Sequence, residues 1–241
     1  MMIEHESPFI FLGQERSECP ASLVIGNRQY VRLGGDVYAP QEPTEEELVQ
    51  LYAAWIERDV DDYDQHNSWA ISIGYNSYEL AQPYLNGLPI DVIDVACGTG
   101  LVSLGIKERA TVGRHVGIDI TPQMIRRALM KPELRDSLMV FHADIRSPGI
   151  LPDESFDLAV GSLFINHLPR PEDARLAFEN VAASLRPGGV FILVDTPRNA
   201  RQDRYLPSLV TTFNHVEAIQ MVHEKEADYR FPLDYYVARL L

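Results

Sequence analysis

The sequence has little cysteine, no long apolar run and comparatively few basic residues. Cys19 and Cys97 are the only cysteines among 241 residues, which excludes a disulfide framework and a cysteine-rich zinc site. No apolar stretch reaches the roughly 20 residues that span a bilayer. The acidic start, residues 1–7, lacks the basic residues that open a secretory signal peptide. These absences favour a cytoplasmic protein with no membrane partner.

The charge balance argues against nucleic acid as a partner. Lysine and arginine number 21 against 35 aspartates and glutamates, a formal net charge of -14. A protein that grips a phosphate backbone needs a basic face to release counterions, and the sequence contains no run of basic residues. The apolar fraction of 46% and the charged fraction of 23% are typical of a globular protein. The length indicates one elaborated domain.

The first third of the chain predicts an extension before that domain. Apolar residues show no periodic spacing over residues 1–20. The segment Leu23 to Tyr38 predicts short strands, with a hairpin at its glycine-containing breaks. Thr44 and Glu47 form a capping box that opens a helix. That helix presents one apolar stripe made of Leu48, Leu51, Trp55 and Ile56. A second helix is expected around 77–85. We therefore expect an extension over 1–45 and a domain over 46–241 that begins with lid helices over 46–86.

From Pro89 to Asp195 strand and helix patterns alternate. The expected strands are 91–95, 115–120, 138–143, 156–164 and 190–195, and the expected helices are 101–110, 122–130 and 171–185. Parallel strands need crossover connections, so this alternation predicts an α/β fold. The expected architecture is a three-layer sandwich with a doubly wound, mostly parallel sheet.

Ligands of such sheets bind beyond the carboxyl ends of the strands. The residues at those ends are Ala96 to Gly100, Asp119, Asp144, Ser162 to His167, and Asp195. Gly98 and Gly100 permit a tight turn and close approach of the backbone to a ligand. The following helix N-terminus suits a carboxylate or phosphate. Asp119 can accept both hydroxyl protons of a ribose.

A dinucleotide site is the nearest rival interpretation. Its fingerprint requires a third glycine, but Ser103 stands at that position, after Gly98 and Gly100. Asp94 also lies inside the first strand, before the turn, where an acid can hold the loop and meet an ammonium group through water. Neither feature suits a pyrophosphate.

Five segments, in order, resemble the motifs of class I S-adenosylmethionine-dependent methyltransferases. They are Asp-Val-Ala-Cys-Gly-Thr-Gly from Asp94, Gly-Ile-Asp-Ile-Thr-Pro-Gln-Met from Gly117, His-Ala-Asp-Ile from His142, Phe-Asp-Leu-Ala-Val from Phe156, and Arg-Pro-Gly-Gly from Arg186. The first carries the family's common variant with alanine, here Ala96, at the first glycine position. The resemblance covers about Pro89 to Asp195 and implies the family's fold, with an antiparallel last strand.

The resemblance also implies a site for S-adenosylmethionine, with S-adenosylhomocysteine as product. Asp119 would take the ribose hydroxyls, and Ile120 and Met124 would contact the nucleoside. Asp144 would meet the adenine amino group, and Ile145 would pack on the ring. Tyr63, in the pair Tyr63-Asp64, resembles a lid tyrosine over the methionine end. The expected cofactor-binding residues are completed by Asp94, Ala96, Cys97, Gly98, Gly100 and Ser162.

The tail departs from the family pattern. The family ends with a helix, a sixth strand and an antiparallel seventh. After Asp195 the sequence indicates one helix over Arg204 to Glu226 and one β-like run over Leu233 to Leu240. A strand is therefore expected to be missing, or too short to detect.

His167 follows the fourth strand and is a candidate general base, because the pKa of histidine lies near neutrality. The alternative is a packing histidine.

The residues after Asn166 argue against a nucleic-acid amino-methyltransferase. Those proteins have a proline pair after the acidic or Asn residue, whereas His167 follows Asn166 here. No metal-ligand spacing is present.

The sequence favours methyl transfer to O, N or C of a small-molecule acceptor, such as a secondary metabolite. Two alternatives stay open: cyclase- or decarboxylase-like use of the bound cofactor without methyl transfer, and a non-catalytic binding protein. Acceptor identity and a homodimeric state are left undetermined.

Overall fold

The structure is a computed structural model that describes residues 10–11, 22–25, 28–34, 37–40, 60–168, 170–196, 204–226 and 229–240. The chain divides into two compact units, Met1–Asp59 and Val60–Leu241. No helix in the described part of the chain is long and apolar enough to cross a membrane.

The first unit contains a four-stranded antiparallel sheet in the order β1-β4-β3-β2. Its strands are β1 (Ile10–Phe11), β2 (Ser22–Ile25), β3 (Arg28–Gly34) and β4 (Val37–Pro40). The short strands and hairpin predicted over 23–38 are confirmed. The helix predicted through Leu48 and Ile56 lies outside the described residues.

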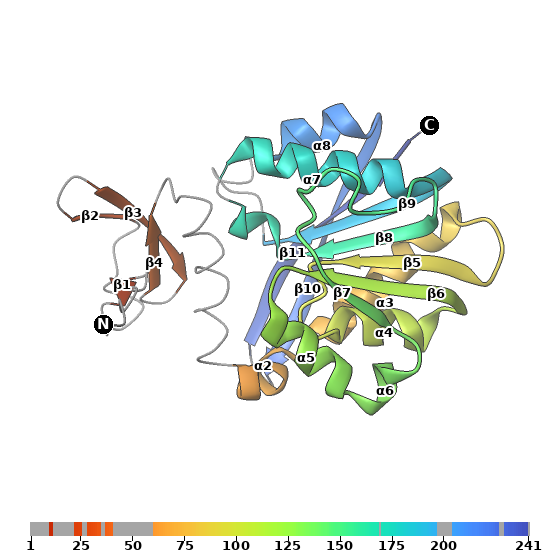
Figure 1. The fold of residues 1–241 in the computed structure, drawn as a ribbon, viewed down its shortest axis with the longest axis horizontal. Helices are drawn as coiled ribbons and strands as arrows, with labels where there is room; N and C mark the ends of the chain where they lie inside the picture. Colours follow the sequence, from red (N-terminus) through yellow and green to blue (C-terminus); the bar gives the residue numbers. More distant parts are fainter. Residues whose placement is uncertain are drawn as a thin grey trace, which may run out of the picture. The chain divides into compact units, whose positions relative to one another are not determined.

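The second unit contains a seven-stranded sheet in the order β10-β11-β9-β8-β5-β6-β7 (Figure 1). The strands are β5 (Ile90–Val95), β6 (Val112–Asp119), β7 (Met139–His142), β8 (Phe156–Ser162), β9 (Leu185–Asp195), β10 (His215–Glu226) and β11 (Tyr229–Arg239). The pairs from β7 to β9 are parallel, and β11 is antiparallel to both β9 and β10. The predicted doubly wound sheet is confirmed.

Helices cover both faces of this sheet. They are α2 (Val60–Asn67), α3 (Ala70–Ala81), η2 (Gln82–Tyr84), α4 (Leu101–Arg109), α5 (Pro122–Met130), α6 (Pro132–Arg135), η3 (Ile165–His167), α7 (Pro171–Ser184) and α8 (Leu206–Thr212). Apolar side chains of α3 and α4 pack with one face of the sheet, and those of α7 and α8 with the other. The central strands are therefore buried on both sides and consist of continuous apolar runs.

The strand order reverses between β5 and β8. The chain runs outward through β5, β6 and β7, then returns to β8 on the other side of β5. The two neighbouring carboxyl ends at this reversal leave room for a ligand, because their connections depart in opposite directions. The edge beside β5 is therefore the position at which a site is expected.

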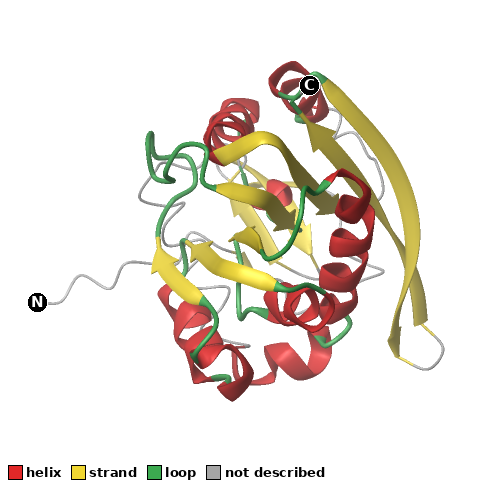
Figure 2. Ribbon diagram, turned by 90° about the vertical axis from the view of Figure 1, so that its right-hand side faces the viewer, coloured by secondary structure: helices red, strands yellow, loops and turns green. Residues whose placement is uncertain are grey.

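The tail of the chain corrects two predictions. The helix expected over Arg204 to Glu226 is wrong: α8 ends at Thr212, and β10 runs from His215 to Glu226. Ile219, Met221 and His223 share one face of β10 at a spacing of two, which is a strand signal. The expectation of a missing strand is also wrong, because β10 and β11 pair along almost their whole length. Figure 2 shows the two strands that lead to the C-terminus as a long curved ribbon.

An ion-pair network joins the beginnings of four strands, β5, β6, β8 and β9. Arg186 lies 2.7 Å from both Asp91 and Asp157, and Arg114 lies 3.4 Å from Asp91. Asp157 and Arg186 belong to two of the motifs recognised in the sequence. Because both lie at the amino end of the sheet, these motifs stabilise strand positions and do not contribute to a ligand site at the carboxyl edge.

Helices α3 and α4 approach each other closely enough for their backbones to touch. A Cβ atom added to Gly105 would lie 2.0 Å from the carbonyl oxygen of Ile71, and one added to Gly74 would lie 2.2 Å from that of Val102. Backbone atoms cannot move aside as a flexible side chain does, so glycine is required at both positions.

We predict that Gly105→Ala lowers the free energy of unfolding by roughly 2–3 kcal/mol, as expected for overpacking in a core. In an unpacked helix the same change would raise stability by about 1 kcal/mol, since alanine is the better helix former. Urea unfolding of the variant and the wild type measures the difference. A stability gain would contradict the close helix contact.

Candidate functional site

The glycine loop that follows β5 is built from three left-handed residues. Ala96, Gly98 and Gly100 have φ angles of 56°, 54° and 82°. The left-handed conformation costs a residue with a Cβ roughly 1–2 kcal/mol, so Ala96 is strained. Such strain persists only where neighbouring bonds hold the backbone in place.

Asp119, at the carboxyl end of β6, supplies some of the hydrogen bonds that keep the loop backbone in place. Its Oδ2 accepts the backbone N–H of Gly98 at 2.8 Å, and its Oδ1 accepts that of Thr121, also at 2.8 Å. Burial raises the pKa of this carboxyl, and the two N–H donors oppose the rise. The hydroxyl of Thr121 is also hydrogen-bonded to this carboxyl. The carboxylate therefore keeps acceptor capacity for a further hydroxyl without releasing the loop.

The two loop glycines have different surroundings. A Cβ added to Gly98 would meet no heavy atom within 4 Å, whereas one added to Gly100 would lie 2.5 Å from Cδ1 of Leu134. Gly100 is therefore packed against the protein, and Gly98 borders open space. That open space lies beside the carboxylate of Asp119.

Asp94, on β5, is a fully buried acid. The hydroxyl of Ser103 donates to its Oδ2 at 2.6 Å, while Oδ1 is buried with no hydrogen-bond partner. Burial is the main cause that raises the pKa of Asp94 to about 7, and the nearby charge of Asp119 adds to it. A cation that approached Oδ1 would offset both effects, because it stabilises the ionised form.

The lid pair Tyr63-Asp64 lies on α2. Burial, followed by the charges of Asp119 and Asp64, raises the pKa of Tyr63 to about 12. Asp64 accepts the hydroxyl of Thr99 from the glycine loop and pairs with the ammonium of Lys131 at 2.6 Å. Sequence reasoning missed Thr99 and Lys131, because no local pattern relates a lysine at the end of α5 to a loop 32 residues earlier.

The residues predicted around the nucleoside lie after β6 and β7. Met124 and Ile145 are buried, and Ile120 is half-buried. The carboxylate of Asp144 is engaged by Arg146, whose Nη2 lies 2.6 Å from Oδ2. This pairing lowers the pKa of Asp144 against the effect of its burial. The role of Asp144 toward an adenine amino group stays a prediction.

Three other predicted residues differ in their placement. The thiol of Cys97 packs against β6, since a Cβ on Gly117 would lie 2.9 Å from its Sγ. Burial raises the pKa of Cys97, so only its backbone is suited to a ligand role. Ser162 ends β8 and His167 ends η3, and both side chains are half-buried.

The hairpin of β10 and β11 extends past the carboxyl edge. Its pairing with β9 ends at Asp195 opposite Asp234, so residues 229–233 continue beyond the sheet. Phe231 in this extension meets Trp69 edge-on at 4.7 Å between ring centroids. His223 is hydrogen-bonded at 2.8 Å to Ser72 of α3. The extension is thus fastened to the helices that precede β5.

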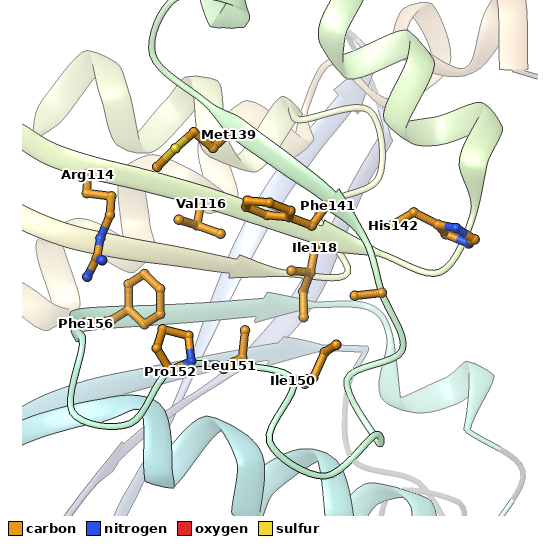
Figure 3. A pocket seen from close by; sticks show the side chains of 11 residues that line it. Arg114, Val116, Ile118, Met139, Phe141, His142, Ile150, Leu151, Pro152 and Phe156 are labelled. Carbon is orange, nitrogen blue, oxygen red and sulfur yellow. The ribbon is translucent and has the colours of Figure 1, made fainter.

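A separate groove of about 370 Å³ lies on the sheet face formed by β6 and β7 (Figure 3). Val116, Ile118, Met139 and Phe141 form its floor. The connection from β7 to β8 contains no helix, which leaves this face partly uncovered. The groove contains none of the predicted cofactor residues. Among the described residues, no group of three His, Cys, Asp or Glu side chains is placed to hold a metal ion.

Comparison with known proteins agrees with this geometry. Residues 93–193 match the family model described as a methyltransferase domain. This part of the chain is therefore similar to a methyltransferase domain. Over 126 residues it is 28% identical to a probable methyltransferase, ltbC, of Aspergillus luteorubrus, a match that covers 47% of this chain and 44% of that protein.

Two solved structures resemble the methyltransferase fold of this chain. The plantazolicin methyltransferase BpumL, in complex with S-adenosylhomocysteine, has a TM-score of 0.57 at 12% identity, covering 80% of this chain and 94% of that one. The [4+2]-cyclase SpnF has a TM-score of 0.52 at 15% identity, covering 68% and 79%. At these identities the likeness concerns the fold alone. The chain spans about half or less of the length of ltbC.

The buried carboxyl of Asp94 predicts that stability depends on pH. Its pKa is about 7 in the fold and 3.8 in the free side chain. Between these values the unfolded chain has lost a proton that the folded protein keeps, so the free energy of unfolding falls as pH rises from about 4 to about 7. Relative to Asp94→Asn, we expect the wild type to lose roughly 3–4 kcal/mol across this window. Urea unfolding of both proteins at several pH values measures this loss. If the free energies of unfolding of the wild type and Asp94→Asn changed in parallel with pH, Asp94 would be ionised in the fold.

Proposed function

We propose that this chain transfers a methyl group from S-adenosylmethionine to O, N or C of a small molecule, such as a secondary metabolite. The observation that carries the proposal is the open space at Gly98. It borders a carboxylate with spare acceptor capacity, Asp119, and lies in the same carboxyl-edge region as Asp94, whose unpartnered oxygen is buried.

The residues present fit this cofactor. Asp119 would accept the ribose hydroxyls, because the N–H groups of Gly98 and Thr121 and the Thr121 hydroxyl do not use all of its acceptor sites. Asp94 would face the ammonium group at the methionine end, directly or through water. Tyr63 on α2 would cover that end. The nucleoside would contact Ile120 and Met124 and lie beside Ile145.

When bound, the cofactor supplies an electrophilic methyl group on its sulfonium. The task of the protein is then to align the acceptor, and positioning alone can contribute about 7–11 kcal/mol to the rate. Tyr63 and the lid helix would exclude water. His167 at the end of η3 is the candidate base for an acceptor that carries a proton at attack. An acceptor that is already nucleophilic needs no base.

The acceptor side would be formed by the hairpin extension. The contact between Trp69 and Phe231 places aromatic surface beyond the end of β9. Pockets for small organic ligands are lined mainly by apolar and aromatic side chains. These features support a small-molecule acceptor rather than a macromolecule, in agreement with the acidic charge of the chain.

The activity is tested by incubating the full chain with methyl-tritiated S-adenosylmethionine and a panel of small phenols, amines and carboxylic acids. Transfer of tritium to an acceptor, with formation of S-adenosylhomocysteine, is the expected result. Conversion of a substrate while the cofactor stays intact would instead support a cyclase-like role. Calorimetry that detects no cofactor binding would indicate a non-catalytic binding protein.

We predict that Gly98→Ala weakens S-adenosylmethionine binding by at least tenfold, since the added methyl enters the space for the cofactor and 1.4 kcal/mol suffices for that factor. Gly87→Ala is a matched control: it has a φ of 81° and equally open surroundings, but it precedes β5 at the amino end of the sheet. Both variants should lose a similar, small amount of stability from left-handed strain. Calorimetric titration measures binding, and equal affinities of the two variants would contradict the assigned space.

A further inference from the structure

Among the described side chains of the lid helix α2, Asp64 attaches the helix to the glycine loop. Oδ1 of Asp64 accepts the hydroxyl of Thr99, and Oδ2 lies 2.6 Å from the ammonium of Lys131. The same ammonium donates to the backbone carbonyl of Thr99 at 2.7 Å. The three residues therefore form a closed triangle that links α2, the loop and the end of α5. We call this group the Asp64 junction.

The Asp64 junction is largely shielded from water. The side chain of Lys131 is 13% exposed and that of Asp64 is 20% exposed, while Thr99 is buried. Burial lowers the pKa of Lys131, and the hydrogen bond to Asp64 opposes this effect. Arg127 also lies 3.5 Å from Oδ2 of Asp64, a longer contact than that of Lys131. Removal of Asp64 or of Lys131 leaves its partner poorly compensated, because both are shielded from water.

The sequence of α2 offers little apolar surface for packing. Its sequence, Val-Asp-Asp-Tyr-Asp-Gln-His-Asn, contains one valine and one tyrosine as apolar side chains. Isolated helices of this length are marginal in water. A helix with so little apolar surface depends on its polar contacts for a fixed position.

Tyr63 directly precedes Asp64 and lies close enough to Asp119 for that charge to affect its pKa. The position of Asp64 consequently fixes where the phenol ring lies relative to the glycine loop. Two residues thus hold the loop through different backbone atoms. Asp119 accepts the N–H of Gly98, and Lys131 donates to the carbonyl of Thr99.

We propose that the Asp64 junction is a latch that keeps α2 and Tyr63 closed over the bound cofactor, and that its opening controls cofactor exchange. The inference rests on the proposed function. Asp64 and Lys131 are positioning residues in it: they act through Tyr63 and the loop and do not touch the reacting atoms.

The test compares Asp64→Asn, Lys131→Met and the double variant in the full chain. Release of tritiated S-adenosylmethionine into excess unlabelled cofactor gives the dissociation rate. We expect each single change to speed release roughly tenfold, as for a lost charged hydrogen bond, with a much smaller change in the association rate. The double variant should release no faster than either single variant, because both changes open the same junction.

Two further variants separate positioning from general loss of stability. Lys131→Arg keeps the charge and should restore slow release. Arg126→Met removes an exposed cation from the same helix, α5, and should release the cofactor at the wild-type rate. Unchanged release from Asp64→Asn and Lys131→Met, or fully additive effects in the double variant, would overturn the latch.

Hydrogen exchange of the cofactor-free protein tests the junction apart from the proposed function. Lys131→Met should speed amide exchange in residues 60–67 and leave β5 and β8 protected. Failure of the wild type to bind S-adenosylmethionine would refute the proposed function but would not alter this readout. Equal protection of α2 in the variant and the wild type would show that the junction does not hold the helix, and the latch would then be wrong.

Discussion

The carboxylate of Asp119 is the constraint on which the site depends. It ends β6 and binds the N–H of Gly98 in the loop after β5, so it joins two neighbouring strand ends into one rigid edge. The strained conformation of Ala96 is tolerated because this bond fixes the turn that follows. The same carboxylate keeps acceptor capacity for a ligand, so binding of the proposed cofactor's ribose would be coupled to the shape of the loop.

Two buried acids in one region are costly unless a ligand compensates for them. Burial raises the pKa of both Asp94 and Asp119, and the charge of Asp119 adds to the rise at Asp94. A stable core would gain from replacing Asp94 by an apolar residue, since an unpaired buried polar group carries a desolvation penalty. Its retention is consistent with a cationic ligand at the carboxyl edge, where the proposed cofactor has its ammonium and sulfonium groups.

The predictions that held depend on local patterns, and those that failed depend on distant partners. The alternation of apolar runs and helix signals predicted the sheet from β5 to β9. The glycine loop was predicted from its own residues. The segment 215–226 was wrongly assigned to a helix. Its length and its content of glutamate, glutamine and methionine favour a helix, yet pairing with β11 makes it a strand. β-Propensity depends on cross-strand neighbours that the sequence does not display.

The sequence by itself determined the order of the elements, the position of the glycine loop and the acid that ends β6, because each is encoded within a few consecutive residues. Only the tertiary structure decided that Lys131 and Asp64 meet at Thr99 and that Asp157 and Arg186 form an ion pair. These contacts join residues on different elements. Their geometry is set by strand register and helix packing, which are properties of the whole fold.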